Sequence, residues 1–155
     1  MSVKAIPEGF HTATPYLAIK GASDAIEFYK KAFGATERFR LDMPDGGVGH
    51  AEILIGDSPI MLSDECGESH FHSPATLGGS SFGVHLYVED VDARFAQAIA
   101  AGATELSPVK DQFYGDRLGS LKDPYGHVWF LSTHIEDLSE AQIAERAKAM
   151  FEREG

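Results

Sequence analysis

The fold is decided by a sequence that occurs nearly twice, DAIEFYKKAFGATE at residues 24–37 and DARFAQAIAAGATE at residues 92–105. The two stretches share Asp-Ala at the start and Gly-Ala-Thr-Glu at the end, at a single offset of 68 residues (92 − 24 = 102 − 34 = 68). A repeat of about half the chain is too long for a solenoid unit and indicates two copies of one supersecondary module. Two copies create a cleft between them, and we expect the functional site there.

The first copy predicts a β-α-β-β-β module within residues 11–64. Residues 14–19 are β-branched and aromatic, as is typical of a strand. Apolar residues at three-to-four spacing then predict a helix that Ser23 or Asp24 caps and that Gly34 ends. Three further strands are expected at residues 36–41, 48–55 and 60–63.

The second copy predicts the same order within residues 82–133, after a loop rich in Gly, Ser and His. Its helix runs from Asp90 to Gly102, and its strands are expected at residues 83–88, 104–109, 117–121 and 127–132. A last helix is predicted over residues 138–153, where Ser139 and Gln142 form a capping box. We therefore expect one α+β domain over residues 1–155, with two repeated modules and a C-terminal helix.

Composition limits the classes of partner. With 155 residues and 43% hydrophobic residues, the chain fits one compact domain. A net charge of −11 argues against binding nucleic acid or an anionic membrane, because both would repel it. The sequence has neither an apolar run of about 20 residues nor the apolar core of a signal peptide, so we expect a cytoplasmic protein. The single cysteine, Cys66, cannot form an internal disulfide and is expected to be an ordinary loop thiol.

Several motifs then resemble one family over nearly the whole chain. The similarity is carried by TPYL at residues 14–17, AIEFYKKAFGA at 25–35, HAE at 50–52, YGDR at 114–117, DPYGHVW at 123–129 and THIED at 133–137. These stretches are similar to the PhnB-like branch of the vicinal-oxygen-chelate superfamily, which contains glyoxalase I, bleomycin-resistance proteins and extradiol dioxygenases. The resemblance implies that the two modules curl into a cup-like mixed sheet, usually in a homodimer.

In metal-using relatives, the resemblance implies that four inward His or Glu side chains hold one divalent ion, two from each module. Counting from the helix starts and the last turn places these positions at Thr14, Leu62, Gly83 and Phe130, by way of the 68-residue offset. None of these residues is a usual ligand of a divalent ion, so we expect no metal cofactor. A shift by two residues keeps the same face of each strand and offers Tyr16, Asp64, His85 and Ser132, a set that could hold an ion weakly.

His85 is the best single candidate for a catalytic residue. It lies in mid-strand on the face of Gly83 and Tyr87, where a neutral imidazole could exchange a proton; the alternative is a buried structural histidine. Arg117 would suit an anionic ligand or would pair with Asp111, Asp116 or Asp123. The expected ligand-binding residues are Thr14, Tyr16, Leu62, Gly83, His85, Tyr87, Arg117, Phe130 and Ser132.

Two further clusters have both a chemical and a structural interpretation. His70 and His72 alternate like a metal clip near Glu68, although a loop between modules explains them as well. His50 and Glu52 share one strand face, which permits an acid–base couple or ordinary cross-strand contacts. Trp129 alternates away from Phe130 and should pack under a helix.

The cup residues are apolar and aromatic with a few hydroxyls. They predict a cytoplasmic homodimer that binds a small, partly planar organic molecule without a metal. A metal-dependent lyase or isomerase of the same superfamily, acting on an α-oxo or related substrate, is the alternative. An interaction protein that uses the apolar stripe of the last helix is a third hypothesis.

Overall fold

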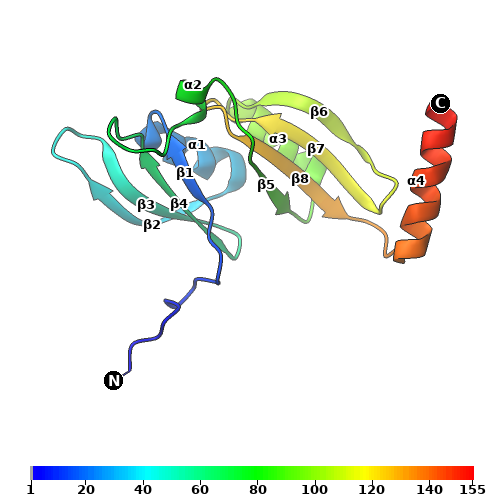
Figure 1. Cartoon of the computed structure of the whole chain (residues 1–155), viewed down its shortest axis with the longest axis horizontal. Coiled ribbons are helices and arrows are strands. Elements are labelled where there is room, and N and C mark those ends of the chain that lie inside the picture. The colour runs from blue at the N-terminus through cyan, green and yellow to red at the C-terminus, as the bar shows by residue number, and fades with distance from the viewer. Residues whose placement is uncertain (1) are drawn as a thin grey trace.

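The computed structural model describes residues 2–155 and contains two four-stranded mixed sheets (Figure 1). The first module comprises β1 (Tyr16–Ile19), α1 (Ala22–Phe33), β2 (Thr36–Asp42), β3 (Val48–Ile55) and β4 (Ser58–Asp64). Its strand order is β1-β4-β3-β2, in which β1 and β4 are parallel and the other pairs are antiparallel.

The second module repeats this order with β5 (Gly83–Tyr87), α3 (Val91–Ala101), β6 (Thr104–Asp111), β7 (Asp116–Lys122) and β8 (Val128–His134). Its sheet has the order β5-β8-β7-β6, with β5 and β8 parallel. The predicted α+β fold with two repeated modules is thus confirmed. A linker with the short helix α2 (Pro74–Leu77) joins the modules, and α4 (Glu140–Glu154) ends the chain.

Each sheet has one face toward the helices and one open face. The helix faces carry the core, and α1 packs against α3 where the modules meet. Trp129 points to this side and contacts Tyr29 and Phe33, as its alternation with Phe130 predicts. The open faces of the two sheets together are called the cup face below, and they lie side by side in Figure 1.

A buried polar network joins the two modules behind the sheets. The Asp123 carboxylate accepts hydrogen bonds from Tyr29 Oη (2.6 Å) and Trp129 Nε1 (2.9 Å), and it also accepts two backbone N–H groups of its own turn. Burial and the adjacent Asp123 carboxylate raise the pKa of Tyr29. His127 Nε2 donates to the Ala18 carbonyl of β1 at 3.0 Å. These bonds fix the orientation of one module against the other.

The repeat offset differs between the helices and the strands. The glycines that end the helices, Gly34 and Gly102, are 68 residues apart, but the partners Tyr16 and Met61 correspond to His85 and Phe130 at 69 residues (85 − 16 = 130 − 61 = 69). The turn before β8 contains one additional residue, which raises the offset between β4 and β8 to 69. Leu54 pairs with Pro59 across residues 55–58, whereas Lys122 pairs with Val128 across residues 123–127, which is one residue more.

A second insertion lies before the first helix. Tyr16 lies eight residues before Asp24 (24 − 16 = 8), whereas its counterpart His85 lies seven residues before Asp92 (92 − 85 = 7). The additional residue precedes α1, where Gly21 has a left-handed conformation (φ 93°). A side chain at this position would be strained, and glycine permits the turn. This additional residue gives β1 the same 69-residue offset to β5 that β4 has to β8. The pairing of β1 with β4 is therefore equivalent to that of β5 with β8.

The C-terminal helix α4 is held mainly by polar contacts. Its capping box forms between Ser139 and Gln142, and Arg146 bonds the Glu136 carboxylate and the Phe113 carbonyl. It buries none of its residues and lies at the end of the second sheet, away from the first module (Figure 1). Across residues 2–155, every helix is too short or too polar to span a bilayer.

Candidate functional site in the cup

Three stacked rings occupy the cup face of the second module. Tyr87 and His85 from β5 have ring centroids 4.8 Å apart, and Phe130 from β8 lies 6.1 Å from His85, each pair within about 26° of parallel. Tyr87 is 65% exposed and Phe130 is 36% exposed, so the rings are accessible. The structure therefore places three of the predicted ligand-binding residues together, on one side of one sheet.

Gly83 makes room for this stack. A Cβ atom at Gly83 would lie 2.7 Å from Cε2 of Phe130, which is closer than real contacts allow. Because Gly83 lies two residues before His85 on the same face, the absence of a side chain lets the Phe130 ring lie over the strand. This is the role of Gly83 at the predicted site, in place of ligand contact through a side chain.

Two hydrogen bonds orient the polar groups among the rings. His85 Nε2 and Ser132 Oγ are 2.7 Å apart, across the pair β5 and β8. Tyr87 Oη donates to Asp116 Oδ2 at 2.9 Å, and this bond to a carboxylate raises the pKa of Tyr87. Asp116 is only 4% exposed, and His134 Nδ1 also contacts it at 2.8 Å. The imidazole of His85 is thus fixed by a hydroxyl partner, and among residues 2–155 no carboxylate bonds either of its nitrogens.

A cleft of about 660 Å³ runs along the free edge of β5. It is lined by His85 and Tyr87 of β5, by the turn at residues 55–58 of the first module, and by Arg94 and Gln97 of α3. Phe33 of α1 also lines it. This cleft is where the two modules meet next to the stacked rings.

The cup face of the first module carries a hydrogen-bonded chain of three side chains. Tyr16 Oη lies 2.8 Å from His50 Nδ1, and His50 Nε2 lies 3.1 Å from Glu52 Oε2. His50 and Glu52 therefore contact each other along β3, and Tyr16 reaches them across the intervening strand β4. Sequence reasoning found the couple of His50 and Glu52 but missed Tyr16 as its third member, since that contact depends on the strand order.

One predicted ligand-binding residue of the first module, Leu62, faces the helices and not the cup. Leu62 is fully buried on the helix face, and its neighbour Met61 points into the cup opposite Tyr16. The prediction of Leu62 was wrong because the 68-residue offset of the helices was applied to β4, where the offset is 69. A shift of one residue turns every side chain of a strand to the other face. Thr14 lies before β1 and is half-buried.

Asp64 is also on the helix side, where it holds the start of α1. Its Oδ1 accepts the backbone N–H groups of Gly21 (3.0 Å) and Ala22 (2.8 Å), and its Oδ2 accepts that of Val48 (2.7 Å). Thr133 does the same in the second module, where its Oγ1 accepts the N–H of Val91 at 2.9 Å. Asp64 is thus removed from the alternative ligand set for a divalent ion.

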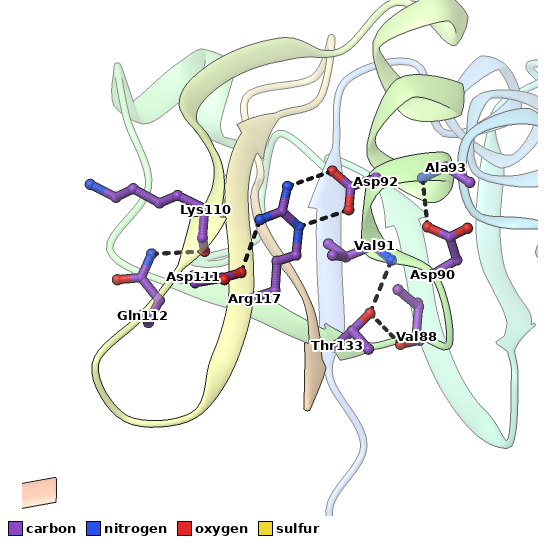
Figure 2. A network of polar contacts seen from close by, with 10 residues as sticks. All are labelled: Val88, Asp90, Val91, Asp92, Ala93, Lys110, Asp111, Gln112, Arg117 and Thr133. Atoms are coloured by element: carbon purple, nitrogen blue, oxygen red, sulfur yellow. Dashed lines mark hydrogen bonds and ion pairs between the residues drawn. The ribbon is translucent and has the colours of Figure 1, made fainter. Parts of the chain in front are cut away.

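Arg117 braces the helix side of the second sheet and does not reach the cup. It forms two hydrogen bonds to the Asp92 carboxylate of α3, at 2.8 and 2.9 Å, and one to Asp111 at 2.9 Å (Figure 2). Asp92 and Asp111 raise the pKa of Arg117, and the guanidinium lowers the pKa of Asp92. The prediction that Arg117 binds a ligand in the cup was wrong, and its predicted pairing with Asp111 is confirmed.

The histidines of the linker do not form a metal clip. His72 Nδ1 lies 2.9 Å from Glu65, whose carboxylate also accepts hydroxyl bonds from Ser73 (2.9 Å) and Thr76 (2.6 Å). Hydrogen bonds from the hydroxyl of Thr76 first, and then from the hydroxyl of Ser73 and the imidazole of His72, lower the pKa of Glu65 to about 2. Within residues 2–155, no three His, Cys, Asp or Glu side chains are grouped so as to hold a metal ion. Cys66 is exposed and unpaired in this linker.

The equivalent inward positions of the two modules do not fit the metal site that the resemblance implies. With the corrected register, they are Thr14 and Met61 in the first module and Gly83 and Phe130 in the second. None supplies the imidazole or carboxylate that a Zn²⁺, Mn²⁺ or Fe²⁺ site of this kind requires.

Comparison with known proteins agrees with this architecture. The family model of the glyoxalase/bleomycin resistance protein/dioxygenase superfamily matches residues 10–131. An uncharacterised protein of Mycobacterium bovis is 40% identical over 134 residues, which cover 84% of this chain and 88% of that protein.

Two solved structures illustrate the shared fold. An Arabidopsis thaliana protein is 28% identical with a TM-score of 0.63, and the match covers 79% of this chain and 98% of that one. A PhnB protein of Bacillus cereus is 22% identical with a TM-score of 0.59, over 79% of this chain and 99% of that one. The sequence match over most of the chain and the two β-α-β-β-β modules show that this protein belongs to the glyoxalase/bleomycin resistance protein/dioxygenase superfamily.

Proposed function

We propose that this protein binds a small, partly planar organic molecule on the second-module half of the cup, without a metal ion. The observation that carries the proposal is the accessible stack of Tyr87, His85 and Phe130. Aromatic faces bind planar molecules by burial and by offset stacking. Because Tyr87 and Phe130 are exposed, their rings are accessible to a ligand ring.

The cleft beside β5 supports the same proposal. Its volume of about 660 Å³ lies within the range of about 300–1,000 Å³ that is usual for small-molecule sites. The buried Ser132 hydroxyl orients the exposed His85 ring, whose second nitrogen can fix the orientation of a ligand by a hydrogen bond. Apolar rings with a few placed polar groups are typical of binding sites for small organic molecules.

The metal-dependent lyase or isomerase is the weaker alternative. Its best remaining ligands are His85 and Ser132, because Asp64 faces the helix and is saturated by three backbone N–H groups. One imidazole and one hydroxyl hold a divalent ion poorly. The donor set therefore supports binding by stacking better than binding through a metal.

The test is ligand binding by purified protein before and after treatment with a chelator. We expect sub-stoichiometric Zn, Ni, Mn and Fe by elemental analysis. A thermal-shift screen with planar aromatic antibiotics, small oxo-acids and phosphonates should give hits among the planar aromatic molecules. Stoichiometric metal that the chelator removes together with binding would contradict the proposal.

Matched variants locate the binding site. Phe130→Ala should weaken binding of a hit by about fivefold or more in calorimetry, because a stacked ring contributes roughly 1 kcal/mol or more. Phe39→Ala removes an equally large exposed ring from the first-module sheet and should leave the affinity within a factor of two. Equal losses in both variants would place the ligand elsewhere.

We also propose that the protein is a homodimer. The last helix buries none of its residues and exposes Phe151 by 64%, which leaves an apolar stripe available to a second copy. Sedimentation equilibrium should give twice the mass of the chain, 16.8 kDa, and Phe151→Glu should shift the equilibrium toward monomer. A monomer at every concentration up to about 100 μM would contradict this proposal.

A further inference from the structure

We propose that Tyr16, His50 and Glu52 form a metal-free general-base site, which removes a proton from carbon in a small uncharged molecule bound beside β1. The site lies on the first-module half of the cup. It is separate from the stacked rings of the second module, so it stands whether or not that stack binds a ligand.

The directions of the hydrogen bonds are set by the carboxylate. An ionised Glu52 can only accept, so His50 Nε2 carries the hydrogen and donates it at 3.1 Å. His50 Nδ1 then carries a lone pair, and Tyr16 Oη donates to it at 2.8 Å. The order is hydroxyl, imidazole and carboxylate, in which the imidazole can take the hydroxyl proton and the carboxylate stabilises the resulting cation.

The sheet places these groups on one face. Tyr16 pairs with Met61, and Met61 pairs with Glu52, so these three residues form a row across β1, β4 and β3. His50 lies two residues before Glu52 on the same face of β3. The side chain of His50 is 26% exposed and that of Glu52 is 18% exposed. Water is thus partly excluded from the imidazole and the carboxylate, which strengthens the interaction between them.

Tyr16 also forms part of the wall of a cavity of about 280 Å³ between β1 and the linker. The wall includes Phe71, whose ring meets that of Tyr16 edge-on at 5.7 Å, together with Leu77 and Phe82. In the part of the chain that the structure describes, its polar members besides Tyr16 are His70, His72, His127, Ser80 and Ser81, and the wall includes no Asp, Glu, Lys or Arg. A cavity of this size, with apolar rings and no formal charge, fits a small uncharged planar molecule.

The proton transfer balances without a co-reactant. The substrate C–H gives its proton to the oxygen of Tyr16 as the phenolic proton passes to His50 Nδ1. The electron pair of the broken C–H bond stays with the substrate, as a new π bond and a leaving group or as a delocalised anion. The imidazolium, opposite Glu52, then releases its proton to solvent, and the site returns to its first state.

The experiment uses 5-nitrobenzisoxazole, an uncharged planar carbon acid. Removal of its ring C–H proton forms a nitrile and breaks the N–O bond, and the product is a coloured phenolate. We expect the full-length protein to accelerate this reaction above the buffer rate with saturation kinetics, both before and after treatment with a chelator. Tyr16→Phe should lose about 100-fold of the protein-dependent rate, the lower end of what a general base contributes.

Two variants separate chemistry from structure. Glu52→Gln keeps the size of the side chain and should lower kcat by about tenfold or more, with little change in KM, because it acts on the imidazolium. Tyr114→Phe removes a tyrosine hydroxyl that makes no side-chain hydrogen bond within residues 2–155, and it should retain the wild-type rate. All variants are first checked for an unchanged thermal midpoint.

The outcomes are decisive. A protein-dependent rate that Tyr16→Phe abolishes and Tyr114→Phe retains supports the proposal. No acceleration by the wild-type protein overturns it, as does a rate that is equal in wild type and Tyr16→Phe. Loss of the rate after chelation, with recovery on adding Zn²⁺ or Mn²⁺, would overturn the metal-free assignment.

Discussion

Tyr16 in the first module and His85 in the second occupy equivalent positions, since each lies opposite the corresponding residue, Met61 or Phe130, of the neighbouring parallel strand. Tyr16 belongs to a hydrogen-bonded chain that ends in a carboxylate, whereas His85 belongs to a stack of rings. The same scaffold thus carries proton-transfer groups on one half of the cup and a stacking surface on the other.

The helix faces of the two modules are more alike. Leu62 and Leu131 are equivalent and both fully buried, and Asp64 and Thr133 each accept a backbone N–H at the start of the long helix of their own module, α1 or α3. Packing against a helix restricts the size and polarity of these side chains. The open faces have no such restriction. The two copies therefore differ on the open faces, which carry the candidate site, and agree on the helix faces, which form the core.

The largest expected change in stability comes from comparing the last turns of the two modules, at residues 123–127 and 55–58. Asp123→Ala leaves the buried donors of Tyr29 and Trp129 without an acceptor, so the free energy of unfolding should fall by about 3 kcal/mol or more. Asp57→Ala, in the exposed turn of the first module, should change it by less than about 0.5 kcal/mol. Urea denaturation measures both, and similar values would contradict the view that only the second turn locks the modules together.

The two helix starts should also respond differently. Asp64→Ala removes the acceptor for three backbone N–H groups and should cost about 2 kcal/mol. Thr133→Val removes the acceptor for one and should cost about 1 kcal/mol. Urea denaturation measures the free energy of unfolding of both variants. A larger loss for Thr133→Val than for Asp64→Ala would contradict this prediction.

A smaller effect concerns the linker between the modules. Because the folded pKa of Glu65, about 2, lies below its ordinary value of 4.5, this carboxylate contributes stability above about pH 4.5, and the contribution is lost as the pH falls toward 2. Glu65→Gln should lack this part of the pH dependence. Urea midpoints of wild type and variant, measured from pH 6 to pH 2, should therefore converge as the pH falls, and a constant difference would contradict the assignment.

The smallest effect concerns His134 at the end of the second-module sheet. Asp116 first, and then Asp137, raise the pKa of His134 through hydrogen bonds. The interaction stabilises the fold at low pH and is lost as the pH rises through the folded pKa of His134. Asp137→Asn should lower that pKa in an NMR titration, while Asp90→Asn, at the start of α3, should leave it unchanged.

The order of the elements could be predicted from the sequence, because it depends on local signals. The repeat, the periodicity of the helices and the terminal glycines are all read over short stretches. The positions of His85, Gly83 and Phe130 followed from alternation along single strands. The face of Leu62 could not be found in this way, because one additional residue in a distant turn changes the offset that relates the two copies.

Contacts between side chains on different strands also could not be predicted from the sequence. Arg117 was expected in the cup, but its side chain lies on the face of β7 toward α3. There it bonds Asp92 of α3 and Asp111 of β6. The approach of Tyr16 to His50 requires that β4 lie between β1 and β3, which no local pattern encodes.

By itself the sequence determined two β-α-β-β-β modules and a capped C-terminal helix, because propensity, capping and alternation act within a few residues. The tertiary structure alone decided which side chains meet: the stack on one half of the cup, the chain of Tyr16, His50 and Glu52 on the other, and the helix-side places of Leu62, Asp64 and Arg117. The physical reason is that strand order and register are set by packing of the whole domain, and a shift of one residue exchanges the core face for the open face.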